Sequence, residues 1–296
     1  MGTPGNNADH SAPGAPTVEV AAGSGVCFGV RRALELADKA LQEGRPVFSL
    51  GPLIHNPQEV ARLAEKEFRV VHAIDEAPDG GTLLIRSHGL QPSVVAEARR
   101  RGMQIIDATC PLVHRVQTLA GELRKAGYEV VVAGDAAHPE VVAIQGYAPT
   151  AHLVGGVEAV RALRLGPRVA LVAQTTFSPE AFRQVASELL KADFQEVRVV
   201  NTICAATVER QRAAAELAGR VDVMWVIGGR NSANTNRLAE LCAARGVPTY
   251  HVEQADEVLP EHLRGRRRVG VVAGASTPQW IIEAVCERIR ALLKDR

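Results

Sequence analysis

The chain has 296 residues, of which 46% are hydrophobic and 23% are charged. This balance is typical of globular proteins that bury a core, and it excludes a disordered, collagen-like or coiled-coil chain. Lysine and arginine together number 34 and aspartate and glutamate 33, so the formal net charge is +1. Since no overall field attracts such a chain to nucleic acid or to an anionic membrane, we expect neither as a partner.

The N-terminal residues 1–17 are rich in glycine, proline, alanine and asparagine. They lack the basic start and the apolar middle of a signal peptide, and we interpret them as a disordered tail. No later run reaches the roughly 20 apolar residues that a membrane-spanning helix requires. These features predict a cytoplasmic protein.

A pattern that recurs along the chain has its first copy directly after this tail. The apolar stretch VEVAAGSGVC ends at Cys27, residues 31–44 have helical character, and the β-rich run PVFSLG stops at Gly51. His55 lies four residues beyond that glycine. A looser second half ends in the run TLLIRSHG, which places His88 just beyond a strand.

The same pattern follows twice more, with helices expected over 111–127 and 205–220. Twenty-four residues separate each cysteine from its glycine: Cys27 from Gly51, Cys110 from Gly134, and Cys204 from Gly228. Polar residues occupy the equivalent loops, namely His138 and Ser232 beyond the glycines, and Thr175 and Ser276 beyond the later strands VALVAQTT and VGVVAGAS. Matches at two fixed spacings indicate an internal threefold repeat.

Strands that alternate with helices of this length are typical of βαβ units on parallel sheets. We therefore predict three small α/β domains, residues 18–110, 111–203 and 204–296, in a pseudo-threefold, trilobed arrangement. In open parallel sheets, ligands bind outside the carboxyl ends of the strands. The repeated cysteines and polar loops nearly all occupy that position, so we expect them to meet at one shared centre.

The five cysteines divide into two kinds. An odd number without a CxxC pair argues against a disulfide framework and against the common zinc motifs. Cys242 and Cys286 lie on apolar faces of expected helices and are interpreted as buried. Three thiolates from Cys27, Cys110 and Cys204 suit a soft metal centre, above all an iron–sulfur cluster. A [4Fe-4S] cluster on three cysteines has one open iron, which is a catalytic arrangement.

The polar loop residues form a set rich in hydrogen-bond donors and poor in carboxylates. Its members are His55, His88, His138, Ser232, Asn234 and Ser276. Such donors suit a phosphate or diphosphate better than a metal, and helix N-termini add partial positive charge. Neither GxxxxGK[ST] nor GxGxxG occurs, so the common nucleotide-binding loops are missing.

Glu140 is the one carboxylate within these loops. Held protonated near a cluster and a substrate, it can serve as the acid for a departing hydroxyl group. The alternative is a glutamate that stabilises the first turn of a helix through the helix dipole, and both roles are compatible. Thr175 can relay a proton through its hydroxyl group.

Nine motifs spread over residues 25–276 resemble, in order, those of the 4-hydroxy-3-methylbut-2-enyl diphosphate reductase family. They are GVCFGVRRAL, GPLIHNPQEV, RSHG, DATCPLV, HPEV, AQTT, NTICAAT, NSANTNRL and AGAS. The resemblance implies a trilobed α/β fold around a [4Fe-4S] cluster on Cys27, Cys110 and Cys204. It also implies a diphosphate held by the donor set above, Glu140 as proton donor and Thr175 as its neighbouring hydroxyl. One departure is Ala233, where members of the family carry a second serine.

The resemblance further implies the reaction. An allylic diphosphate loses its hydroxyl group with two electrons and two protons, giving isopentenyl diphosphate and dimethylallyl diphosphate in the last step of the methylerythritol phosphate pathway. Because no flavin or nicotinamide motif is visible, the electrons are expected from a partner such as ferredoxin or flavodoxin. Two alternatives stay open: an iron–sulfur dehydratase that needs no reductant, and a cluster-bearing sensor or phosphate-binding module without turnover.

Overall fold

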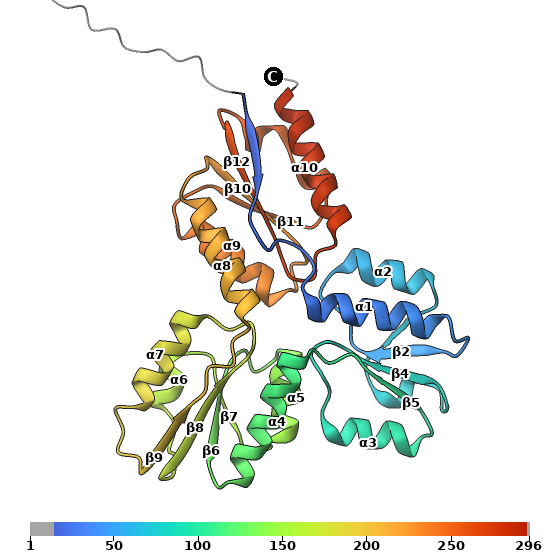
Figure 1. The fold of residues 1–296 in the computed structure, drawn as a ribbon, viewed down its shortest axis with the longest axis vertical. Helices are drawn as coiled ribbons and strands as arrows, with labels where there is room; N and C mark the ends of the chain where they lie inside the picture. The colour runs from blue at the N-terminus through green and yellow to red at the C-terminus, as the bar shows by residue number, and fades with distance from the viewer. Residues whose placement is uncertain (1–14, 295–296) are drawn as a thin grey trace, which may run out of the picture.

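The computed structural model describes residues 15–294. Over this range the strands form three four-stranded sheets whose pairings are all parallel. Figure 1 shows each sheet with its helices as a separate lobe, and the three lobes surround a common centre. The predicted fold class is confirmed. The predicted tail lies outside the described residues except for its last three, and Thr17 already begins a strand.

The first lobe contains the sheet β3-β2-β4-β5. Its strands are β2 (Val47–Leu50), β3 (Arg69–Val71), β4 (Thr82–Ile85) and β5 (Gln104–Asp107). Helices α1 (Phe28–Leu41) and α2 (Pro57–Glu65) pack on one face. Helix α3 (Pro92–Arg100) packs on the other face, near the short 3₁₀ helix η1 (Ile74–Glu76).

The second lobe repeats this arrangement with the sheet β7-β6-β8-β9. Its strands are β6 (Glu129–Ala133), β7 (His152–Val154), β8 (Arg168–Ala173) and β9 (Glu196–Val199). Helices α4 (Pro111–Lys125) and α5 (Pro139–Tyr147) cover one face. Helices α6 (Val157–Arg161) and α7 (Pro179–Leu189) cover the other.

The third lobe has the sheet β11-β10-β12-β1. Its strands are β10 (Val223–Ile227), β11 (Thr249–Val252), β12 (Arg268–Ala273) and β1 (Thr17–Val20). Helices α8 (Ala205–Ala218) and α9 (Ala233–Ala243) cover one face. Helix α10 (Gln279–Lys294) covers the other, together with the 3₁₀ helices η2 (Ala255–Glu257) and η3 (Pro260–Leu263).

Strand β1 corrects the predicted start of the first domain at residue 18. It pairs with β12, from Thr17 opposite Arg268 to Val20 opposite Val271, and so belongs to the third lobe. In Figure 1 it is the blue strand within the orange and red lobe. The physical reason is that helix α10 follows β12, so the third sheet has no later strand for the edge that β5 and β9 occupy in the other two sheets. The N-terminal strand fills that edge.

The strand order explains why the centre can hold a site. In the first two sheets the chain begins at an inner strand, moves to one edge, and then crosses to the other inner strand. The third sheet follows the same path from β10 onwards, so the order switches between β2 and β4, β6 and β8, and β10 and β12. Ligands bind at such switch points, outside the carboxyl ends of the strands. None of the helices within the described range combines the length and apolarity of a membrane span.

Candidate active site

One central cavity is lined by loops from all three lobes. All eleven residues that the sequence singled out line it: Cys27, His55, His88, Cys110, His138, Glu140, Thr175, Cys204, Ser232, Asn234 and Ser276. The structure therefore brings together residues that are up to 249 positions apart in the chain.

The three cysteines are held by the same local geometry in each lobe. Each cysteine is the N-cap residue of a helix, of α1, α4 and α8 respectively. The backbone N–H of each donates to a carbonyl two residues beyond a central strand: Cys27 to Ala275 at 3.0 Å, Cys110 to Ser87 at 3.0 Å, and Cys204 to Thr175 at 2.8 Å. The repeat that the sequence spacing indicated is thus a repeat of backbone hydrogen bonds.

The three thiols are free and half-buried, and all three line the central cavity. Burial raises the pKa of Cys110, the N–H groups of Leu112 and Val113 lower it, and the charges of Cys27 and Cys204 raise it further. A side chain on Gly29 of α1 would place its Cβ 2.7 Å from the Cys110 sulfur, so only glycine leaves room there. Three free thiols around one cavity suit a soft metal centre.

The remaining two cysteines are packed as the sequence predicted. Cys242 is fully buried in the core under α8 and α9, and Cys286 is buried under α10. Burial raises the pKa of Cys242 to about 11, so its thiol stays protonated. Neither residue lines the central cavity.

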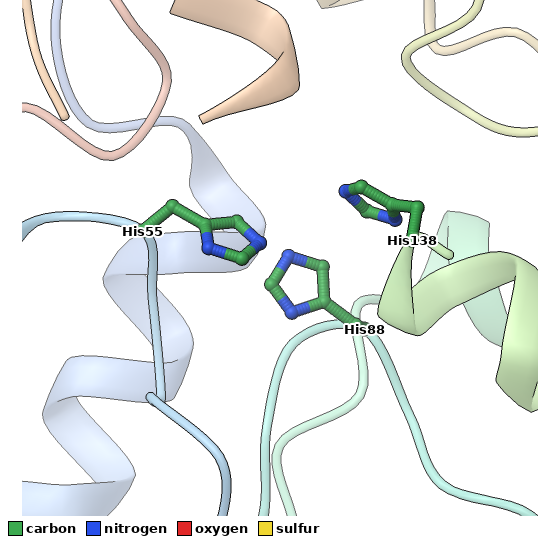
Figure 2. Close-up of side chains that lie close together, drawn as sticks. All are labelled: His55, His88 and His138. Carbon is green, nitrogen blue, oxygen red and sulfur yellow. The ribbon is translucent and has the colours of Figure 1, made fainter. Parts of the chain in front are cut away.

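Three histidine rings lie together at the cavity wall, as Figure 2 shows. His55 follows β2, His88 follows β4, and His138 is the N-cap of α5 in the second lobe. The ring centroids of His55 and His88 are 4.7 Å apart, those of His88 and His138 5.3 Å, and those of His55 and His138 5.7 Å. One ring nitrogen from each lies within 4.8 Å of the others.

Burial keeps these imidazoles neutral in the absence of a ligand. It lowers the pKa of His138 to about 4 and that of His88 well below its ordinary value, and it lowers the pKa of His55 as well. The positive charge of Arg86 adds to all three shifts. Each neutral ring keeps one N–H donor and one lone pair. The Nδ1 atom of His138 accepts the backbone N–H of Glu140 at 3.1 Å, so its N–H is on Nε2.

Several buried polar atoms at the cavity have no hydrogen-bond partner among the described residues. They include both ring nitrogens of His55, the Nδ1 atom of His88, and the side-chain oxygen and nitrogen of Asn234. Buried polar atoms are nearly always paired in proteins. We therefore expect a polar ligand to complete these bonds.

Glu140 is the most deeply buried carboxyl group of the cavity, with 1% of its surface exposed. Its Oε1 atom accepts the backbone N–H of Thr175 at 2.6 Å, and its Oε2 atom accepts the Thr175 hydroxyl at 2.8 Å. Burial raises the pKa of Glu140 to about 7, although both bonds from Thr175 lower it. Near neutral pH the carboxyl group therefore retains a proton that it can donate.

The third lobe contributes hydroxyl and amide groups. The Ser232 hydroxyl accepts the backbone N–H of Thr235 at 3.3 Å as the N-cap of α9, which leaves its own proton free to donate. The Ser276 hydroxyl donates to the backbone carbonyl of His55 at 3.0 Å and joins the third lobe to the first. Ala233 lines the cavity beside Ser232, at the position where the family resemblance implies a second hydroxyl.

Sequence reasoning missed some polar residues of the cavity, chiefly Thr207 and Arg210 of α8. Arg210 is 4% exposed, which is rare for arginine. The available signal was helical spacing: Thr207, Arg210, Gln211 and Ala214 recur at the period of one helix face, and all four are buried. Polar side chains on the same face as a buried alanine indicate a polar interior.

Three doubly wound α/β units around one cysteine- and histidine-lined cavity define a trilobed protein with a central active site. The chain belongs to the LytB protein family, whose profile matches residues 18–290. The family predicted from the sequence motifs is therefore confirmed.

Curated relatives span almost the whole chain. A protein of Pelobacter propionicus named 4-hydroxy-3-methylbut-2-enyl diphosphate reductase is 47% identical over 272 residues, which cover 92% of this chain and 96% of the relative. A protein of Aquifex aeolicus with the same name is 44% identical over 283 residues, covering 94% and 97% of the two chains.

Two solved structures have the same fold. One, described as (E)-4-hydroxy-3-methyl-but-2-enyl diphosphate reductase, the terminal enzyme of the non-mevalonate pathway, is 43% identical with a TM-score of 0.69, and covers 93% of this chain and 99% of its own. The other, E-1-hydroxy-2-methyl-but-2-enyl-4-diphosphate reductase from Plasmodium falciparum, is 25% identical with a TM-score of 0.87, and covers 94% of this chain and 88% of its own.

Proposed function

We propose that the chain reduces 4-hydroxy-3-methylbut-2-enyl diphosphate to isopentenyl diphosphate and dimethylallyl diphosphate, the last step of the methylerythritol phosphate pathway. The curated relatives bear this enzyme's name, so the activity and the oxidoreductase class predicted from the sequence are confirmed. One observation supports the proposal most strongly. Three free thiols, a buried carboxyl group with a raised pKa and a set of unpaired donors share a single cavity.

The cofactor we propose is a [4Fe-4S] cluster on Cys27, Cys110 and Cys204. The residues fit it, because the thiols are unpaired, line one cavity, and lie at the N-termini of three helices. The room left by Gly29 at the Cys110 sulfur supports the same assignment. When bound, such a cluster supplies electrons and one iron with an open position for the substrate's hydroxyl oxygen.

The substrate's diphosphate is proposed to bind the donor set of the same cavity. That set comprises His55, His88, His138, Ser232, Asn234 and Ser276. Its unpaired ring nitrogens and amide match an anion that presents several oxygens. The N-terminus of α9, which begins after Ser232, adds partial positive charge.

Glu140 is proposed as the proton donor. Its carboxyl group gives a proton to the leaving hydroxyl, which departs as water, while two electrons enter and a second proton adds to the allylic carbon chain. The Thr175 hydroxyl holds the Glu140 carboxyl in place and provides a route by which a new proton reaches it. Burial of Glu140 excludes bulk water from this step.

We propose that the electrons come from a small carrier protein such as ferredoxin or flavodoxin. The cytoplasmic location and the division into residue ranges stay predictions, apart from the correction for β1.

The test is turnover by the cluster-reconstituted chain under anaerobic conditions, with and without a chemical reductant. We expect the allylic diphosphate to give both C5 diphosphates, and only when reductant is present. Turnover without reductant would favour the dehydratase alternative. Tight diphosphate binding without turnover in either condition would favour the binding-module alternative.

A further inference from the structure

Arg210 forms a link between two of the cysteine-bearing segments. It lies on the buried face of α8, the helix that begins directly after Cys204, and its side chain lines the central cavity. Its Nε atom donates to the carbonyl of Gly23 at 2.7 Å and its Nη2 atom to the carbonyl of Gly25 at 3.0 Å. Both carbonyls belong to the loop that ends at Cys27.

That loop joins β1 in the third lobe to α1 in the first, so it crosses between lobes within a few residues. It contains two glycines with positive φ, Gly23 at 73° and Gly25 at 96°, a backbone conformation that residues other than glycine rarely adopt. The planar fork of a guanidinium can hold two carbonyls at once in fixed positions.

The charge of Arg210 has no carboxylate partner among the described residues. Burial lowers its pKa, and the charges of Cys27 and Cys204 act in the opposite direction. A buried cation without an ion partner is costly. The negative charge that compensates it is therefore that of the thiolates and of whatever they bind.

Arg32 provides a natural comparison in the first lobe. This residue of α1 donates to the carbonyls of Asp107 at 3.0 Å and Thr109 at 3.3 Å, in the loop that ends at Cys110. It thus supports the next cysteine loop in the same way. Arg32 is half-buried and does not line the cavity. It therefore supports a cysteine loop as Arg210 does, but it places no positive charge in the cavity.

We propose that Arg210 is a positioning residue that fixes the Cys27 loop and, through its buried charge, raises the reduction potential of the cluster. The inference rests on the proposed cluster. A reduced cluster carries one more negative charge than an oxidised one, so a nearby cation in a low-dielectric site stabilises the reduced form. Arg32 supports its loop without this effect.

Three variants separate the support from the charge: Arg210→Met, Arg210→Lys and Arg32→Met. After anaerobic reconstitution, we would measure iron per chain, the rate of iron loss to a chelator, and the midpoint potential by a dye-mediated titration followed by electron paramagnetic resonance. Outer partners of metal ligands typically change metal affinity about 10–100-fold, so iron loss should be about tenfold faster in all three variants. Only Arg210→Met should have a clearly more negative potential, because Arg210→Lys keeps a cation and Arg32→Met removes none from the cavity.

Circular dichroism and inorganic pyrophosphate binding by the cluster-free variants verify that the fold and the donor set are intact. A parental potential in Arg210→Met, or an equal shift in Arg32→Met, overturns the role of the charge. Parental iron loss in both Arg210 variants overturns the role in positioning. A parent chain that holds no cluster after reconstitution overturns the proposed function itself, which distinguishes the two failures.

Discussion

At the scale of single residues, Glu140 has the environment with the clearest chemical consequence. A carboxylate at the surface near a helix N-terminus typically gains only about 0.3–1 kcal/mol from the dipole. Glu140 is instead buried against the cavity, and its pKa is raised to about 7. A purely structural role gives no reason for this burial, whereas a proton donor that works near neutral pH requires such a pKa.

We therefore predict that Glu140→Gln retains its cluster and binds substrate but reduces it at least about a hundredfold more slowly, since general acids typically contribute about 10²–10⁴-fold. Glutamine keeps the shape and cannot supply the proton. Single-turnover reduction under anaerobic conditions with a chemical reductant measures this without docking of an electron carrier. Turnover within a few-fold of the parent would leave Glu140 with the structural role alone.

The histidine cluster predicts how stability depends on pH. The pKa values of His55, His88 and His138 are lowered in the folded chain, so the unfolded chain binds more protons below about pH 6.5. Their stabilising contribution is present above that pH and is lost as pH falls towards about 4, the pKa of His138. The raised pKa of Glu140 has the opposite effect over part of this range, but one group does not outweigh three.

The free energy of unfolding of the cluster-free chain should thus fall from pH 7 to pH 5, and it should fall less steeply in His138→Phe. Urea unfolding at several pH values measures both slopes. Loss of the N-cap bond of α5 lowers the stability of the variant at every pH, so the comparison is between slopes. Equal slopes would mean that His138 does not titrate differently on folding.

The sequence allowed all eleven candidate residues to be chosen because the repeat aligned their loops and the family motifs named their types. Arg210 could not be chosen in that way. It lies in the middle of a helix, where arginine usually indicates a solvated face, and its two acceptors are backbone carbonyls of glycines more than 180 positions away. When a side chain contacts backbone groups that are far away in the sequence, the local sequence pattern contains no sign of that contact.

At the scale of elements, the three helices that begin after the cysteines determine how closely the sulfurs approach. Helix α1 has Gly29 in its first turn, and a Cβ there would lie 2.7 Å from the sulfur and 3.0 Å from the Cβ of Cys110. Glycine inside a helix costs roughly 0.5–1 kcal/mol relative to alanine. Glycine at this position destabilises the helix slightly but leaves space for the Cys110 side chain.

We predict that the Gly29→Ala variant folds without the cluster but binds markedly less iron after reconstitution, because the new methyl group forces Cys110 to move. Gly121→Ala in α4 is the matched control, since a Cβ there would meet only the backbone oxygen and the Cβ of Tyr147 at 3.5 and 3.6 Å, which are ordinary contacts. Iron and sulfide per chain after reconstitution measure the effect. Equal cluster contents in the two variants would contradict the steric argument.

The sequence predicted the first residues of α4 and α8, Pro111 and Ala205, but not that of α1. The first helix was expected from residue 31, whereas α1 begins at Phe28, directly after Cys27. Phe28 is 68% exposed and Gly29 is a poor helix former, so neither residue has the pattern of a helix start. The helix begins there because the Cys27 backbone N–H is bound to Ala275, a contact across the lobe boundary.

At the scale of the whole molecule, strand β1 joins the two ends of the chain. The sequence showed an apolar stretch before Cys27 but not the strand with which it pairs, because pairing with β12 spans about 250 residues and depends on which sheet lacks an edge strand. The threefold repeat was visible, but the closure of the third sheet by the first strand was not. A sequence repeat identifies the equivalent segments, but it does not show to which lobe's sheet each strand belongs.

A chain without residues 1–20 should therefore lose stability in the third lobe and hold little cluster, because β12 loses one of its two neighbouring strands and the Cys27 loop loses its anchor. A chain without residues 1–14 retains β1 and is the control. Thermal unfolding and iron content of both truncated chains measure the effect. Parental behaviour of the shorter chain would show that β1 does not support the centre.

The pairing of β1 with β12 also determines when the third sheet can form during synthesis of the chain. During synthesis at about 5–20 residues per second, β1 leaves the ribosome first, but its only neighbour in the sheet, β12, begins at Arg268. For nearly the entire period of translation the N-terminal strand has nothing to pair with, and Cys27 has no fixed place. The first two lobes can mature as they emerge, whereas the three sulfurs can assemble only after the ribosome has almost finished. Loading of the proposed cluster is therefore expected only after the polypeptide is complete.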